Sequence, residues 1–207
     1  MTSLTLYTNP MSRGRIARWM LEEVGEPYRA VILEFGPAMQ ESDFLALNPI
    51  GKVPVLRHGD TVVSEGAAIC AYLADAFPQQ KLAPPLEQRG AYYRWLFFAA
   101  GPLEAAVTAK ALGLLAPAEK SGMAGYGTFE KTIDMLESAV AGREFIAGDS
   151  FTAADVYVGS QIGWGLMFGT IEQRPAFKTY VDRMRARPAA LRASALDDAA
   201  MPPPKTS

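Results

Sequence analysis

The sequence predicts an α/β domain over residues 1–77 followed by an all-helical domain over residues 88–200. Three observations lead to this fold class. Strand-like and helix-like segments alternate only in the first 77 residues, and no convincing strand follows residue 87. Between the two regions, residues 78–87 (PQQKLAPPLE) are rich in proline and polar side chains, which is typical of a linker. The proline-rich segment 201–207 is expected to be a disordered tail.

The α/β domain is predicted to begin with a strand, a helix and a second strand. Residues 4–7 form a short apolar segment. Ser12 can cap a helix that ends at Gly25 and whose apolar residues recur every four positions. Residues 28–33 are rich in β-forming side chains. A βαβ unit of this kind is expected to pair its two strands in parallel.

A hairpin and a final helix complete the predicted α/β domain. Residues 37–47 have only a weak helical pattern. Residues 55–57 and 61–63 flank a His-Gly-Asp turn and predict two antiparallel strands. An apolar stripe over residues 69–77 then predicts a helix. The expected order is therefore βαβ, helix, ββ, helix.

The all-helical domain is predicted from four further stretches, residues 88–115, 117–142, 152–170 and 175–199. The first is expected to bend near Gly101 and Pro102, and the last to break at Pro188. Thr152 is followed three positions later by Asp155, which is the spacing of a capping box with Asp in place of the usual Glu or Gln.

Composition and charge favour a soluble, cytoplasmic protein. The formal net charge is −2, which gives no electrostatic reason to expect nucleic acid as a partner. The single cysteine, Cys70, allows no intrachain disulfide and favours a reducing compartment. No secretion signal and no membrane span are expected. A group of basic residues near the C-terminus is expected to form a solvated face: Arg174, Lys178, Arg183, Arg185, Arg187 and Arg192.

Three motifs carry a resemblance to a known family. They are NPIGKVPVL (residues 48–56), SEGAAICAYLADAFP (residues 64–78) and GDSFTAAD (residues 148–155), and the first two follow the βαβ unit. In this order they resemble the cytosolic glutathione transferase superfamily, serine- or cysteine-type, over nearly the whole chain. The resemblance implies a thioredoxin-like N-terminal domain, a C-terminal helical bundle and glutathione as co-substrate. No metal is expected, because the sequence has a single histidine and no apparent metal-ligand cluster.

The segment YTNPMS, which ends at Ser12, resembles the family pattern Y-x-x-P-x-S/C. The resemblance assigns Ser12 to the thiol of glutathione. The alternative donors in the same loop are Tyr7, Thr8 and Asn9, and a tyrosine that ends a buried first strand is more often part of the core.

A serine hydroxyl is too weak a base to take the thiol proton outright, but it can donate a hydrogen bond to the thiolate. Such a bond to a charged group contributes roughly 1.5–3 kcal/mol. The N-terminus of the following helix adds roughly 0.3–1 kcal/mol for a nearby anion. Arg13 and Arg15 are expected to add positive potential. Ser12 can serve as both helix cap and thiolate donor.

The resemblance assigns the other parts of glutathione to Val53, Pro54, Glu65, Gly66 and Lys52. A cis bond before Pro54 would turn the backbone of Val53 outward to pair with the peptide. Glu65 would pair with the ammonium group and the N–H of Gly66 would receive the γ-glutamyl carboxylate. Most members have a serine where this chain has Gly66, so affinity for glutathione is expected to be lower. Lys52 would meet the glycine carboxylate.

Aromatic and thioether side chains supply the expected electrophile pocket, with Met11, Phe98 and Trp164 as its walls. Core packing is the alternative for each of the three. The resemblance implies a homodimer that conjugates the glutathione thiolate to small apolar electrophiles in detoxification. A non-catalytic member that binds glutathione or a partner protein is the alternative function.

Overall fold

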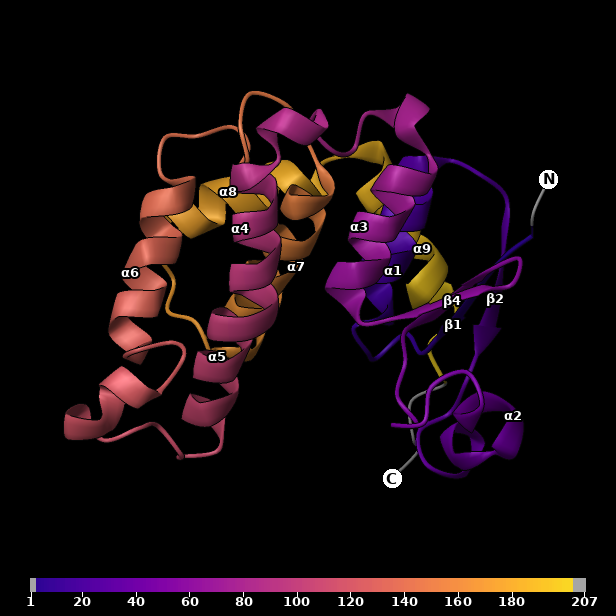
Figure 1. The fold of residues 1–207 in the computed structure, drawn as a ribbon, viewed down its shortest axis with the longest axis horizontal. Helices are drawn as coiled ribbons and strands as arrows, with labels where there is room; N and C mark the ends of the chain where they lie inside the picture. Colours follow the sequence, from indigo (N-terminus) through magenta and orange to yellow (C-terminus); the bar gives the residue numbers. More distant parts are fainter. Residues whose placement is uncertain (1–2, 203–207) are drawn as a thin grey trace. The chain divides into compact units, whose positions relative to one another are not determined.

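The computed structural model describes residues 3–202, and the predicted disordered tail lies mostly outside them. The chain divides into two compact units (Figure 1). The first unit contains the residues up to Gln80 together with those from Ala186 onward, and the second runs from Lys81 to Arg185. The first boundary falls inside the segment that the sequence predicts as a linker. None of the helices between residues 3 and 202 has the length and apolar character needed to cross a membrane.

A four-stranded mixed sheet forms the centre of the first unit. Its strands are β1 (Leu4–Thr8), β2 (Tyr28–Ile32), β3 (Val55–His58) and β4 (Thr61–Ser64). Their order in the sheet is β2-β1-β3-β4. β1 pairs with β2 in parallel, whereas β1 with β3 and β3 with β4 are antiparallel. This arrangement confirms the predicted βαβ unit and hairpin.

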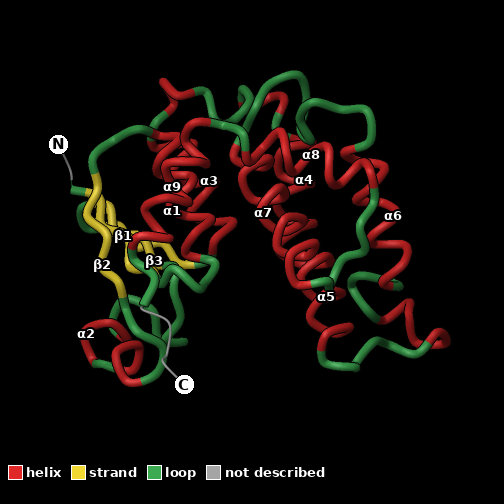
Figure 2. The backbone as a smooth tube through the Cα atoms, turned by 180° about the vertical axis from the view of Figure 1, so that it is seen from behind, coloured by secondary structure: helices red, strands yellow, loops and turns green. Residues whose placement is uncertain are grey.

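Three helices gather beside this sheet: α1 (Gly14–Val24), α3 (Gly66–Ala76) and α9 (Pro188–Ala199) (Figure 2). Ile16, Met20 and Val24 are at most 1% exposed, so the four-residue repeat in α1 is its core-facing side. α1 ends at Gly25, whose φ of 76° closes the helix in the left-handed region. The short η1 (Pro37–Gln40), α2 (Ser42–Leu45) and η2 (Pro78–Gln80) complete the unit.

The second unit is built from helices, with one isolated β-bridge between Phe145 and Gly148 among its described residues. Its elements are η3 (Leu86–Gln88), α4 (Gly90–Phe98), η4 (Ala99–Leu103), α5 (Glu104–Ala111), η5 (Ala118–Met123), α6 (Phe129–Val140), α7 (Ala153–Phe168) and α8 (Pro175–Arg185). The predicted bend is the π-helical turn η4, which contains Pro102. Proline has no N–H to donate, so the regular α-helical pattern is interrupted there.

The predicted helix over residues 117–142 begins later than expected. Residues 118–123 form only a 3₁₀ helix, and α6 begins after Thr128, whose hydroxyl accepts the Lys131 N–H at 3.2 Å. Gly125 and Gly127 lie between the two segments, and Gly127 has a φ of 68°. A positive φ is incompatible with a right-handed helix, so the chain needs a new start.

Asp155 closes the start of α7 as the capping-box pattern predicts. Its carboxylate accepts the Thr152 N–H at 2.9 Å and the Thr152 hydroxyl at 3.1 Å. It also accepts the Ile146 N–H at 2.8 Å and the Tyr180 hydroxyl at 2.7 Å. Asp155 is fully buried and forms no ion pair with the described residues, and burial raises the pKa of its carboxyl.

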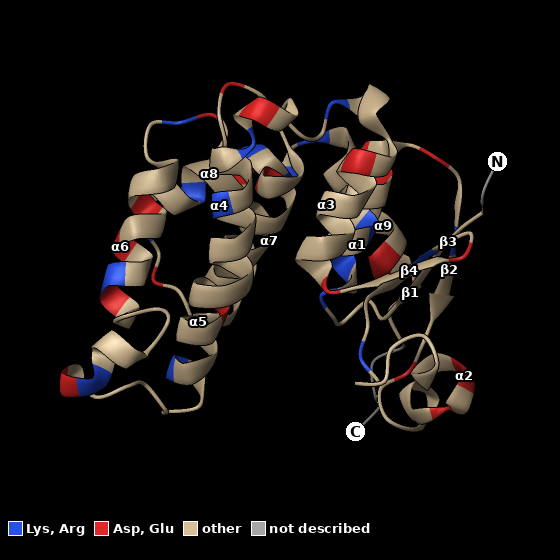
Figure 3. Ribbon diagram, viewed as in Figure 1, with Lys and Arg blue, Asp and Glu red and all other residues tan. Residues whose placement is uncertain are grey.

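Helix α9 lies elsewhere than the sequence predicts. The prediction places residues 186–200 in the all-helical domain, but α9 packs along α1 in the first unit. The physical reason is a set of ion pairs between the two helices. Arginines in the first half of α1 pair with acidic residues at the end of α9, and glutamates at the end of α1 pair with arginines at or near the start of α9. Figure 3 shows charged residues of both signs on these two helices. The first unit is therefore built from both ends of the chain.

Candidate functional site

Three segments of the first unit meet at one end of the sheet. Tyr7 near the end of β1 pairs with Val55 at the start of β3, and Val55 pairs with Ser64 at the end of β4. The loop that contains Ser12 follows β1, Val53 lies two residues before Val55, and Glu65 follows Ser64. The register of the sheet thus brings together the predicted thiol, peptide and γ-glutamyl positions, which are far apart in the sequence.

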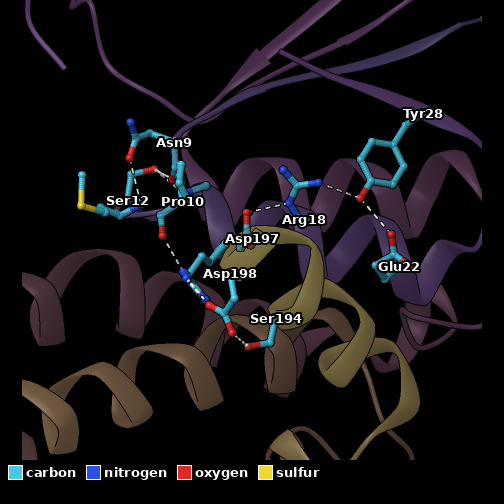
Figure 4. A network of polar contacts seen from close by, with 12 residues as sticks. Asn9, Pro10, Ser12, Arg18, Glu22, Tyr28, Ser194, Asp197 and Asp198 are labelled. Carbon is cyan, nitrogen blue, oxygen red and sulfur yellow. Dashed lines mark hydrogen bonds and ion pairs between the residues drawn. The ribbon is translucent and has the colours of Figure 1, made fainter. Parts of the chain in front are cut away.

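Asn9 is the scaffold of the loop between β1 and α1. Its side-chain Nδ2 donates to the Leu33 carbonyl at 2.8 Å, and its Oδ1 accepts the Met11 N–H at 2.8 Å. Its own carbonyl accepts the N–H of Ser12 at 3.0 Å. Asn9 is only 5% exposed, so this side chain holds the loop from within the fold. Figure 4 shows Asn9 beside Pro10 and Ser12.

Ser12 is half-buried, and its hydroxyl makes two hydrogen bonds. The Oγ donates to the Asn9 carbonyl at 2.7 Å and accepts the Gly14 N–H at 2.9 Å. Gly14 is the first residue of α1, so the hydroxyl satisfies one of the unpaired N–H groups at the helix start. The predicted capping contact is present, although the residue directly before the helix is Arg13.

The other candidates in this loop are held inside the fold. Thr8 is fully buried, and its Oγ1 has no hydrogen-bond partner among the described residues. A Cβ added at Gly14 would lie 1.9 Å from that Oγ1 and 3.0 Å from the Ser12 Oγ, so only glycine fits here. The Tyr7 ring packs against Phe44 with centroids 5.9 Å apart, in a cluster with core residues.

The Val53–Pro54 peptide bond is cis, as the resemblance implies. The side chain of Asn48 donates to the Lys52 carbonyl at 2.8 Å and fixes the turn that precedes this bond. Within residues 3–202, the N–H and C=O of Val53 make no hydrogen bond. Val53 therefore offers a backbone donor and acceptor to an extended peptide. The Lys52 side chain is exposed.

Glu65 has an unusual backbone conformation at the start of α3. Its φ is 69° and its ψ is 120°, a region that costs a non-glycine residue of order 1–3 kcal/mol. Its exposed carboxylate has no ion-pair partner in the described part of the chain. Gly66 begins the helix, so its N–H lies among the unpaired donors of the first turn. The Glu65 carboxylate and the Gly66 N–H are therefore neighbours, and together they could bind the ammonium and the carboxylate of a zwitterion.

The predicted pocket residues lie in different surroundings. Met11 is 54% exposed in the loop next to Ser12. Phe98 in α4 is 8% exposed and packs edge-on against Trp95 at 5.5 Å, which is core packing of the second unit. Trp164 in α7 is half-buried. Cys70 is fully buried and burial raises the pKa of its thiol, so it supplies no nucleophile.

Helix α9 brings acidic side chains to the site loop, which the sequence analysis missed. Arg15 donates its Nε to the Pro10 carbonyl at 2.5 Å and its Nη2 to the Asp198 Oδ1 at 2.6 Å (Figure 4). Next to it, Arg18 donates to Asp197 at 2.7 Å in a pair that is almost fully buried. The i, i+3 spacing of Arg15 and Arg18 and the adjacent Asp197 and Asp198 are visible in the sequence, but nothing in the sequence links the two helices.

The basic residues near the C-terminus form no simple solvated face. Arg187 binds Glu23 with both of its nitrogens, at 2.7 and 2.8 Å, and Arg192 binds Glu22 at 3.1 Å. In the second unit, Arg174 pairs with Asp134, Glu137 and Glu172, and Arg183 donates to two carbonyls. These arginines join elements of the fold.

Comparison with known proteins covers both units. Residues 2–75 match the family description "Glutathione S-transferase, N-terminal domain", and residues 105–188 match "Glutathione S-transferase, C-terminal domain". Glutathione S-transferase GstB of Escherichia coli strain K12 is 30% identical over 180 residues, which span 82% of this chain and 86% of that protein. GstA of Escherichia coli O157:H7 is 28% identical over 193 residues, with 89% and 94% covered.

Solved structures of other proteins are similar to this chain in both fold and sequence. A glutathione transferase from Methylococcus capsulatus has a TM-score of 0.78 at 27% identity, over 95% of this chain and 99% of that chain. A sphingomonad glutathione S-transferase, solved in complex with glutathione, has a TM-score of 0.74 at 28% identity, over 94% and 98%. The chain therefore belongs to the glutathione S-transferase family of enzymes.

Proposed function

We propose that the protein conjugates the thiolate of bound glutathione to small apolar electrophiles. The observation that carries this proposal is the meeting of three segments at one end of the sheet: the Ser12 loop, the unpaired backbone of Val53 and the Glu65–Gly66 helix start. A solved relative in complex with glutathione supports the same ligand.

Each part of glutathione meets a group of matching chemistry in this proposal. The N–H and C=O of Val53 pair with the peptide of the cysteine residue, as a short added strand does. Glu65 pairs with the ammonium group, and the Gly66 N–H at the start of α3 receives the γ-glutamyl carboxylate. Lys52, which is exposed, pairs with the glycine carboxylate.

Ser12 must exchange one hydrogen bond to stabilise the thiolate. Its single proton is donated to the Asn9 carbonyl in the free protein. Giving up that neutral bond costs a net ~0.5–1.5 kcal/mol, whereas a bond to an ionised sulfur contributes roughly 1.5–3 kcal/mol. The balance favours the thiolate. A hydroxyl that already accepts the Gly14 N–H is also held at the correct end of α1.

The electrophile is proposed to bind on apolar surface of the first unit, beside the thiol. Met11 is the clearest candidate because it is exposed and one residue from Ser12. Replacing Met11 with Ser is expected to raise KM for an apolar electrophile and to leave KM for glutathione unchanged. An equal rise in both would remove Met11 from this role.

We propose in addition that the protein is a cytoplasmic homodimer that acts in detoxification. Tyr93 and Phe97, one turn apart on α4, are 40% and 70% exposed and offer an aromatic surface for a second copy. Sedimentation of the purified protein tests the dimer, with a monomer at micromolar concentration as the opposing result.

The proposed function is tested by retention on immobilised glutathione and by turnover of a generic aryl halide. Ser12→Ala is expected to lower kcat about 10-fold and by at most about 70-fold, the value of one hydrogen bond to a charged group less that of the neutral bond to Asn9, while retention persists. Ser150→Ala, an exposed serine of the second unit, is the control and should turn over normally. Normal turnover by Ser12→Ala would exclude Ser12.

A carboxylate variant tests the γ-glutamyl position separately. Glu65→Gln is expected to lose retention and to raise KM for glutathione, because the ammonium loses its partner. Asp60→Asn, an exposed carboxylate in the turn at the other end of the hairpin, is the matched control. Retention of the wild type without turnover of any electrophile would favour the non-catalytic alternative.

A further inference from the structure

Arg15 connects the site loop to the C-terminal helix. Its guanidinium reaches the Pro10 carbonyl through Nε at 2.5 Å and the Asp198 carboxylate through Nη2 at 2.6 Å. Pro10 lies between Asn9 and Ser12, the two residues whose hydrogen bonds shape the loop. The planar guanidinium fixes both contacts at once, because its donors are held in a rigid fork.

Asp198 is itself fixed on the other side. It lies in the last turn of α9, and its Oδ2 accepts the Ser194 hydroxyl at 3.3 Å (Figure 4). The neighbouring Asp197 holds α9 to α1 through Arg18. Arg15 lowers the pKa of the Asp198 carboxyl, so this group is ionised at neutral pH. The carboxylate is therefore a steady acceptor for Arg15.

This geometry argues against Arg15 as a free positive charge for the thiolate. The carboxylate of Asp198 offsets its charge at hydrogen-bond distance. One of its donors is occupied by the Pro10 carbonyl, which is the backbone of the loop. What Arg15 supplies to the site is a fixed position for that backbone.

We propose that Arg15 and Asp198 are positioning residues of the thiol site: Asp198 orients Arg15, and Arg15 holds the Pro10 carbonyl so that the loop presents the Ser12 hydroxyl. This inference rests on the proposed function. It makes the docking of the C-terminal helix a requirement for full activity, although no residue of α9 is proposed to contact glutathione.

Asp198→Asn is the informative variant, because it removes the charge and keeps the shape. Arg192→Gln is the matched control. It removes another ion pair between the same two helices, with Glu22, but Arg192 has no contact with the loop. In Asp198→Asn, kcat is expected to fall about two- to fivefold, the value of a partly exposed ion pair, with KM for glutathione unchanged. Arg192→Gln should keep the wild-type kcat.

The pKa of the bound glutathione thiol separates positioning from simple electrostatics. It is measured from the ultraviolet absorbance of the thiolate across pH. If Asp198 acts by holding the loop, its removal raises the thiol pKa, because Ser12 stabilises the thiolate less well. If Arg15 acts as a positive charge, removal of the neighbouring carboxylate lowers the thiol pKa. A lowered or unchanged thiol pKa overturns the proposal.

Substitutions of Arg15 give a second test of the positioning role. Arg15→Ala loses both contacts and should reduce kcat about tenfold or more. Arg15→Lys keeps the charge without the fork and should recover little of that loss. Full recovery by Lys would support the electrostatic role and contradict positioning.

Hydrogen exchange of the ligand-free protein keeps this inference testable apart from catalysis. The N–H groups of Met11, Ser12 and Gly14 are hydrogen-bonded within the loop. Asp198→Asn should speed their exchange, and Arg192→Gln should not. Unchanged exchange in Asp198→Asn refutes the positioning role even if the wild type proves not to bind glutathione. Faster exchange in Asp198→Asn, found together with a wild type that lacks turnover, would instead refute only the proposed function.

Discussion

Asp197→Ala should cause a large loss of stability, because it leaves a buried charge without its partner. Arg18 and Asp197 have side chains that are 5% and 1% exposed, and the Arg18 Nε lies 2.7 Å from the Asp197 Oδ1. The only other polar contact of this guanidinium that the structure records is a long one to the Tyr28 hydroxyl, at 3.4 Å. Burial raises the pKa of Asp197 and Arg18 opposes that rise, so the carboxylate depends on the arginine.

Breaking a buried ion pair of this kind costs about 3–5 kcal/mol, against a total stability of about 5–15 kcal/mol for a typical protein. The urea midpoint of Asp197→Ala should therefore fall steeply. Hydrogen exchange at the amides of α1, on which α9 packs, reports the first unit by itself. A matched double variant, Arg18→Met with Asp197→Leu, removes both charges and should recover most of the loss.

Two outcomes would refute this reasoning. A loss below about 1 kcal/mol in Asp197→Ala would mean that water or another group solvates Arg18 after the change. A double variant as unstable as the single one would mean that the packing of α9, and not the unpaired charge, determines the loss. The proposed coupling between α9 and the site loop would then need a different physical basis.

Three further perturbations test other parts of the structure. Gly14→Ala places a Cβ 1.9 Å from the Thr8 Oγ1 and should lower the unfolding free energy by about 1–3 kcal/mol in urea titration, with recovery when Thr8 is also changed to Ala. Asp155→Ala leaves four buried donors without an acceptor and should lower it by about 4 kcal/mol or more in the same assay, unless water enters the site. Burial and a hydrogen bond to a carboxylate raise the pKa of Tyr28 to about 12. The wild type should therefore lose stability relative to Tyr28→Phe as the pH rises from about 10, the ordinary pKa, to about 12, and a constant difference would contradict this.

Local patterns were sufficient to predict most elements of the fold. The four-residue repeat of α1, the turn between β3 and β4 and the capping-box spacing at Asp155 are decided by residues close in sequence. The meeting of Ser12, Val53 and Glu65 at one end of the sheet, by contrast, is not decided by residues close in sequence. It depends on which strands pair and in which register, and the motif resemblance supplied that information where residue patterns alone could not.

The hydrogen bonds of the Ser12 hydroxyl could not be predicted from the sequence either, because they also depend on residues that are distant in the chain. A serine before a helix can donate, accept or face solvent, and its choice depends on where the Asn9 carbonyl lies. That carbonyl is in turn placed by a contact between Asn9 and Leu33, 24 residues away. The motif identifies the residue, but the energy of its hydrogen bond depends on the loop around it.

The C-terminal helix shows the same limit most clearly. A helix with both basic and acidic residues is as compatible with solvent as with a partner helix, so its charges alone predict a solvated face. Its actual neighbours, Arg15 and Arg18, lie 183 and 179 residues from Asp198 and Asp197. A buried partner changes the role of these charges, because an ion pair that excludes water specifies one docking position. The site loop is thereby joined to the far end of the chain, and residues outside any family motif become part of how Ser12 is held.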